Sequence, residues 1–148
     1  MNATTNTTSE VTTIKGQLCH RHLNPDGSIG GWVSETAHVA SSAYVDYEAM
    51  VLDHAQVRGI VMIFSYAVVA DNAKILGFAT VGDNAIVFEN AIVFGGASVG
   101  GDAQVYGNAI VSGYALVCGG AIVGGDARIY GSAIVSADTD IFGGVTMG

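Results

Sequence analysis

A six-residue period runs through most of this chain without an insertion or a deletion. Alanine occupies 16 of the 19 positions taken every sixth residue from 37 to 145, the others being Val61, Thr139 and Val145. Valine or isoleucine occupies all 19 positions taken every sixth residue from 33 to 141. The unit Ala-x-Val therefore recurs in one phase, a pattern typical of a solenoid in which short strands stack on one another.

Each six-residue unit has the properties of one short strand followed by one turn. Strand side chains alternate between two faces, so the Ala and the Val share a face, which we expect to be the interior. Glycine fills 10 of the 19 positions two residues beyond the Val/Ile column, and Asn or Asp recurs in the column after that. These residue types tolerate left-handed backbone conformations, so the pattern predicts a turn after every strand.

Sides of this length close most simply as a triangle, so three hexapeptide units make one coil of about 18 residues. Residues 31–148 would then form about 6.6 coils, and at about 4.8 Å between paired strands the prism would be roughly 30 Å tall. The sequence therefore predicts an all-β fold, a parallel β-helix shaped as a triangular prism.

The repeats from WVSETAHVASSAYV to GSAIVSADTDIFGG, which make up most of the chain, resemble the hexapeptide-repeat left-handed β-helix family. This resemblance implies a left-handed coil and favours a homotrimer. The segment IGGWVSE, residues 29–35, also resembles the start of uncharacterised bacterial and phage hexapeptide-repeat proteins. That shorter resemblance implies a structural component of the phage type.

The residues that precede the repeats have a different pattern. Residues 11–23 read as a strand, Asn24-Pro25-Asp26-Gly27 as a turn, and residues 28–33 as a second strand. We expect this hairpin to cover the open edge of the first coil. The predicted organisation is a polar N-terminal arm at 1–14, a hairpin cap at 15–31 and the β-helix at 32–148. At the far end the repeats leave an uncovered strand edge.

Composition and charge bear on the partners of the chain. The net charge is −8, and no cluster of Lys or Arg is present to meet phosphates, so we expect no nucleic-acid partner. Polar residues interrupt every apolar run, so we expect no membrane partner. The first residues lack a basic segment followed by an apolar one, which indicates no signal peptide and favours a cytoplasmic or virion-associated protein.

Catalytic chemistry of the resembled family needs residues that this sequence mostly lacks. Acyl transfer there uses loops inserted between coils and a catalytic His, whereas this repeat is unbroken and no His follows His54. Zinc-dependent hydration of carbon dioxide needs three His ligands, and His20 and His22 share one strand face with only Cys19 nearby. We therefore predict no catalytic residue, no cofactor and no metal site.

The residues between Ala and Val point outward and form one column on each side of the prism. On the third side the column is largely apolar: Met50, Val68, Ile86, Gln104, Ile122 and Asp140. Stacked apolar residues of this kind usually mark an interface. We predict a homo-oligomer, preferably a trimer, whose interface on this side and its following corner comprises Met50, Leu52, Val68, Ile86, Phe88, Tyr106 and Ile122.

The first functional hypothesis is a non-catalytic structural or binding protein of the virion or surface type. It would act by assembly and docking, with a protein partner at the N-terminal arm or at the open C-terminal edge. Two alternatives remain open. One is a hexapeptide-type acyltransferase with a site between subunits, and the other is a small acidic interaction or inhibitor protein.

Overall fold

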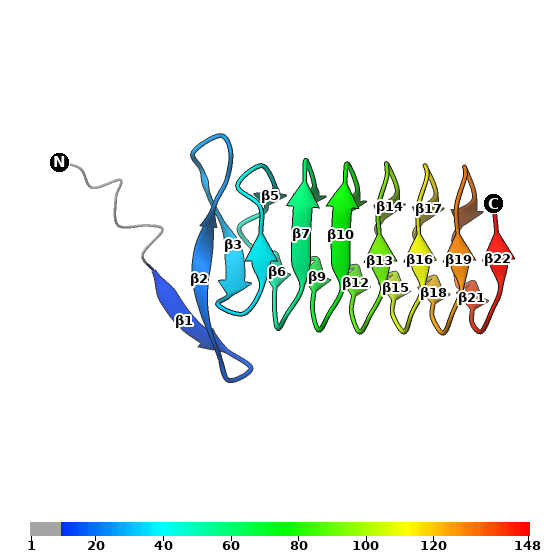
Figure 1. Cartoon of the computed structure of the whole chain (residues 1–148), viewed down its shortest axis with the longest axis horizontal. Coiled ribbons are helices and arrows are strands. Elements are labelled where there is room, and N and C mark those ends of the chain that lie inside the picture. Colours follow the sequence, from blue (N-terminus) through cyan, green and yellow to red (C-terminus); the bar gives the residue numbers. More distant parts are fainter. Residues whose placement is uncertain (1–9) are drawn as a thin grey trace.

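The computed structural model describes residues 10–148, which form strands and turns without a helix. The strands stack as a β-solenoid of about six turns with 18 residues in each coil (Figure 1). The all-β fold and the coil length predicted from the hexapeptide period are thus confirmed. In the described part of the chain, no helix is long and apolar enough to cross a membrane.

Three sheets form the sides of the prism, named sides A, B and C here, and side A is the third side of the predicted prism. Side A contains β1 (Val11–Ile14), β2 (Gln17–Leu23), β3 (Ile29–Ser34), β6 (Met50–Val51), β9 (Val68–Val69), β12 (Ile86–Val87), β15 (Gln104–Val105), β18 (Ile122–Val123) and β21 (Asp140–Ile141). Side B contains β4 (His38–Val39), β7 (Gln56–Gly59), β10 (Lys74–Gly77), β13 (Ile92–Val93), β16 (Ile110–Val111), β19 (Arg128–Ile129) and β22 (Thr146–Met147). Side C contains β5 (Tyr44–Val45), β8 (Met62–Ile63), β11 (Thr80–Val81), β14 (Ser98–Val99), β17 (Leu116–Val117) and β20 (Ile134–Val135).

The coil is left-handed, as the resemblance implied. In Figure 1 the strands of side B lie in front and run upward, and the chain then passes behind them at the top and returns along the bottom as it advances. Crossover connections between parallel strands are otherwise nearly always right-handed. From β3 onward, the short turns place each strand on a different sheet from the strand before it, so each connection winds around the prism.

The core consists of the two columns that the period predicted. Alanines such as Ala85 and Ala103 and branched residues such as Val87 and Val105 are completely buried inside the prism. The register places each inward residue on its equivalent in the next coil, for example Val87 opposite Val105. Identical small and branched side chains therefore pack in continuous stacks, and burying them supplies the main favourable contribution to stability.

Turns take a left-handed backbone at one fixed position, the Gly-rich column. Asp71 and Glu89 have φ values of 57° and 56° there, and Gly113 has a φ of 68°. The column after it, rich in Asn and Asp, contains no positive φ in the described chain. Its Asn84 instead donates to Asp102 over 3.1 Å, one coil further on. The prediction of left-handed turns is confirmed for the glycine column only.

The N-terminal cap is larger than the predicted hairpin. Residues 11–14, assigned to the arm, form β1 and pair with β2, and β2 pairs antiparallel with β3. The single strand predicted over residues 11–23 is broken by a tight turn, in which Lys15 and Gly16 have φ values of 51° and 78°. Two successive positive φ values match the twist of a two-residue hairpin. The remaining arm, residues 1–9, lies outside the described residues.

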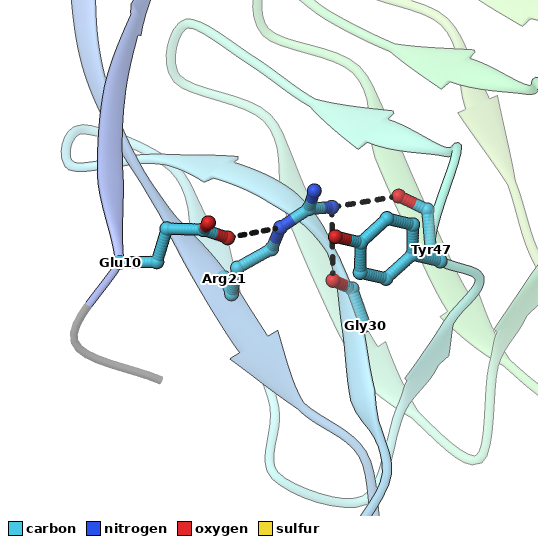
Figure 2. A network of polar contacts seen from close by, with 4 residues as sticks. All are labelled: Glu10, Arg21, Gly30 and Tyr47. Atoms are coloured by element: carbon cyan, nitrogen blue, oxygen red, sulfur yellow. Dashed lines mark hydrogen bonds and ion pairs between the residues drawn. The ribbon is translucent and has the colours of Figure 1, made fainter. Parts of the chain in front are cut away.

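Arg21 attaches the cap to the first coils (Figure 2). Its guanidinium lies 3.9 Å from the ring centre of Trp32 and 3.7 Å from that of Tyr47. It donates to the main-chain oxygens of Gly30 and Tyr47 over 3.3 and 2.8 Å, and to Glu10 over 3.1 Å. A planar cation that lies close to two rings and donates three hydrogen bonds stabilises the contact between β2 and the coils. No feature of the hexapeptide pattern indicated this contact.

Two side-chain amides of the cap bond to main-chain groups of the first coils, as a neighbouring strand would do. Asn24 accepts from the N–H of Val45 over 2.9 Å and donates to its C=O over 3.1 Å. Gln17 likewise accepts from the N–H of Asp53 over 2.8 Å and donates to its carboxylate over 2.7 Å. The edge of the first coil is therefore covered on side A by β2 and on side C by Asn24, as the predicted role of the cap requires.

The glycine column gives a direct test of this architecture. A Cβ added to Gly113 would lie 2.8 Å from the main chain of Gly131, and φ is positive at this position. We expect Gly113→Ala to lower the free energy of unfolding by roughly 1–2 kcal/mol. Urea unfolding followed by circular dichroism measures this change.

Gly144→Ala is the matched control, because no atom lies within 4 Å of a Cβ built there and its φ is not positive. Equal unfolding midpoints for the two variants would contradict the account of the turns.

Candidate functional site

Side A presents a vertical column of outward side chains. The strand register places Met50 on Val68, Val68 on Ile86, and Gln104 on Ile122. The four apolar members of the column are half-buried, and the two polar members, Gln104 and Asp140, are exposed. The structure thus brings these predicted interface residues onto one surface. Trp32 extends the same column towards the cap, because it pairs with Met50.

The corner after side A carries stacked aromatic rings. The ring of Phe88 lies 5.1 Å from that of Tyr106 at an interplanar angle of 15°, and Tyr106 meets Phe142 edge to face at 6.4 Å. Gly124, one coil beyond Tyr106, makes room for the ring, because a Cβ there would lie 2.7 Å from the ring of Tyr106. Phe88 and Tyr106 remain half-buried, so both are available for contact.

Leu52 does not belong to this surface, which corrects the predicted interface. Its exposed fraction is 0%, so it is already covered within one chain. The next residue, Asp53, is bonded to Gln17 at the end of the β1–β2 hairpin. The hairpin turn therefore lies against this corner, a contact that the repeat pattern alone does not reveal.

A shallow apolar groove crosses side A beside the hairpin turn. Its volume is about 310 Å³, and its lining comprises Lys15, Met50, Asp53, Val68, Ala70, Asp71, Ile86, Phe88 and Gln104. The groove contains four of the seven predicted interface residues. Ala70 leaves space in the groove, because its small side chain occupies the position that Phe88 occupies one coil later. Neither Ala70 nor Lys15 was among the predicted interface residues.

Carboxylates line the corner beside the groove and bond to the main chain. Asp53 accepts the N–H of Asp71 over 3.0 Å, Asp71 accepts that of Glu89 over 2.9 Å, and Glu89 accepts that of Gly107 over 2.8 Å. The accepting atom lies one coil before the donor each time. These acids thus satisfy main-chain N–H groups at the left-handed positions, which is a structural role.

Three of the four histidines gather at the N-terminal end of the prism. His20, His22 and His38 line a cavity of about 500 Å³ together with Arg58 and the end of the apolar core. His22 is buried and its Nε2 lies 2.8 Å from the main-chain oxygen of Ala43. His54 is exposed and lies apart from this group, in a corner. Within residues 10–148, no group of three or more His, Cys, Asp or Glu has the geometry to hold a metal ion.

Burial shifts the pKa of two groups near this end of the prism, His22 and Cys19. Desolvation lowers the pKa of His22, the charge of His20 acts in the same direction, and the bond to Ala43 opposes both. The neutral ring that donates from Nε2 is therefore the favoured form. Burial also raises the pKa of the Cys19 thiol, which keeps it protonated and unreactive.

Comparisons with known proteins agree with the fold. Residues 103–119 match a family model described as the YdcK beta solenoid repeat. No curated protein matches the chain. The match supports a repeated β-solenoid, and membership of the hexapeptide-repeat family stays a prediction.

His22 makes the stability of the cap depend on pH. Its pKa is lower in the folded state than the ordinary value of about 6.5, so the unfolded chain binds more protons as the pH falls below that value. The stability of the folded state therefore decreases as the pH falls below about 6.5, because protonation of His22 is then favoured in the unfolded chain. We expect His22→Gln to weaken this pH dependence of the unfolding midpoint.

Thermal unfolding at several pH values between 5 and 7.5 measures the effect. His54→Gln is the control, because it removes an exposed imidazole from a corner outside the cap. If both variants keep the dependence of the native chain, the assignment to His22 is wrong.

Proposed function

We propose that this protein is a non-catalytic scaffold that assembles into a homotrimer through side A. The observation that carries the proposal is the apolar column of side A, in which Met50, Val68 and Ile86 lie directly on one another. Contiguous apolar surface of this kind marks a site of protein contact more often than scattered exposed residues do. The groove beside it and the half-buried ring of Phe88 add area to the same surface.

The chemistry of the surface supports binding by shape. The carboxylates along the corner after side A bond to the main chain, and His22 bonds to a main-chain oxygen. Inward positions of the coils carry Ala, Val and Ile, with Thr139 as the exception. These carboxylates and His22 are therefore occupied in holding the fold, whereas the apolar column of side A has no such partner in one chain.

We propose further that the assembled prism serves as a structural component of a surface or a virion. The resemblance of residues 29–35 to phage-type proteins supports this role. In the structure Gly31 lies so close to the next coil that a Cβ would overlap the main-chain oxygens of Ala49 and Asp46. The segment thus has a physical reason for its glycine at the entry to the coil. A partner would meet the assembly at its ends, through the N-terminal arm or the last strand edge.

The assembly can be tested by charged substitutions on side A. We expect the double variant Ile86→Lys and Ile122→Lys to be a soluble monomer, because each Lys would have to lose its hydration in the interface. Light scattering on the purified chain gives the mass, and circular dichroism verifies the fold. The native chain should have three times the monomer mass.

Leu116→Lys is the matched control, since Leu116 is a half-buried aliphatic residue in the outward column of side C. Its mass should equal that of the native assembly. An unchanged assembly in the side A variant would contradict the interface, and a monomeric native chain would contradict the homotrimer.

A further inference from the structure

The cap covers the edge of the first coil on two of its three sides. On side A, β2 pairs with β3. On side C, His22 Nε2 bonds to the main-chain oxygen of Ala43 over 2.8 Å, and Asn24 bonds to Val45. On side B the first strand is β4, which pairs with β7 alone in the described chain. The cavity of about 500 Å³ that three histidines line lies at this uncovered edge, at the end of the prism that carries β2 and β3 (Figure 1).

The uncovered edge presents main-chain oxygens. Main-chain bonds between coils run from an N–H to an oxygen of the following coil, as from His38 to Ala55 over 2.9 Å. The oxygens of the first coil therefore face the cap. On side B these are the oxygens of Ala37 and Val39, and no residue within 10–148 donates a main-chain hydrogen bond to them. An extended segment beside β4 would bring N–H groups to both oxygens, as a further coil would.

The floor of the cavity is the end of the apolar core. Val33 and Val57 are inward residues of the first coils, and both line the cavity together with Ala37 and Val39. His20 points to the same face of side A as Val33, because the two residues are paired. An apolar side chain placed on this floor would continue the core by one more layer, which is a favourable burial of apolar surface.

The rim of the cavity is basic, although the net charge of the chain is −8. Arg58 and the imidazoles of the three histidines line the cavity, and none of the described residues that line it is acidic. The one ion pair within residues 10–148 lies in the cap and does not involve Arg58. The apolar groove of side A differs in this respect, because Asp53 and Asp71 line it. A free guanidinium beside an apolar floor is complementary to a carboxylate attached to an apolar group.

From these observations we infer that the cavity binds the carboxyl-terminal end of an extended apolar peptide from a partner protein. The peptide N–H groups donate to the oxygens of Ala37 and Val39, and an apolar side chain covers the floor. A segment that continues the parallel sheet of side B runs in the direction of β4 and ends beside Ala40. This small residue holds the position that Arg58 holds one coil later, and both line the cavity. The terminal carboxylate therefore lies next to Arg58, in a known mode of peptide recognition.

The inference goes beyond the proposed scaffold and does not depend on its assembly, because every residue of the cavity belongs to one chain. The test uses the full chain and a short probe peptide, acetyl-Ala-Val-Leu, with a free terminal carboxylate. The same peptide with a terminal amide is the matched ligand control. We expect the carboxylate form to bind roughly tenfold more tightly than the amide, because only the former can accept charge-assisted hydrogen bonds from Arg58. Isothermal titration calorimetry measures both affinities.

Two arginine variants and the histidine signals locate the site. Arg58→Gln should weaken binding of the carboxylate form roughly fivefold, because the side chain that it changes is exposed. Arg128→Gln removes the same charge from an exposed residue of side B, and it should leave the affinity unchanged. Circular dichroism verifies the fold of both variants. In proton NMR spectra the ring signals of His20 and His38 should shift when the peptide is added, whereas those of His54 should not.

Other outcomes overturn the inference. Equal affinities for the carboxylate and the amide would show that the terminal charge is not recognised. Equal losses in the two arginine variants would show a general effect of net charge. Signal shifts at His54 without shifts at His20 and His38 would place the peptide elsewhere, and an absence of binding would remove the site altogether. A monomeric native chain would contradict the proposed homotrimer and leave this inference standing, so the two failures are distinguishable.

Discussion

The constant spacing between hydrogen-bonded coils is the constraint on which the rest of this structure depends. The N–H of Ile86 donates to the oxygen of Ala103 over 3.0 Å, that of Phe88 to Val105 over 3.0 Å, and that of Asn90 to Gly107 over 2.9 Å. Each bond reaches the same distance forward along the chain, into the next coil, whether it lies in a strand or in a turn. An inserted residue would break this series at once. This constant spacing determines how the core residues, the outward columns and the turn carboxylates stack.

The repeated part of the fold could be predicted from the sequence because each six-residue unit forms one strand and one turn, and three units complete one coil. Side chains one coil apart must share a column, so the strand register follows from the numbering alone. The cap could not be predicted in this way, since it has no period. Its contacts depend on antiparallel pairing, on the turn at Lys15 and Gly16, and on the shift in register between β2 and β3 that occurs from Arg21 to Leu23.

The predicted interface residues on side A and its corner show which contacts the repeat pattern does not predict. Six of the seven predicted residues are partly exposed on side A or its corner, as outward positions should be. Leu52 is buried because the cap reaches over that corner, and a hairpin contact of this kind is not encoded in a repeat. Phe78 and Tyr114, which are exposed at the corner between sides B and C, have a sequence signal, namely large apolar residues at one turn position, two coils apart. This signal is recognised only when the three corners are compared at the same turn position.

The chain of carboxylates from Asp53 through Asp71 and Glu89 to Gly107 has a consequence for how such a protein can change its length over evolution. Each acid serves the turn one coil ahead, so duplication of any whole coil inserts a complete link and leaves the others intact. Duplication of one or two hexapeptide units would also preserve the Ala and Val phase, yet it would carry every later surface residue onto a different side. A lineage can therefore lengthen or shorten this prism by whole coils without moving any residue to another side. Gain or loss of one or two hexapeptide units would change which surface residues each side presents.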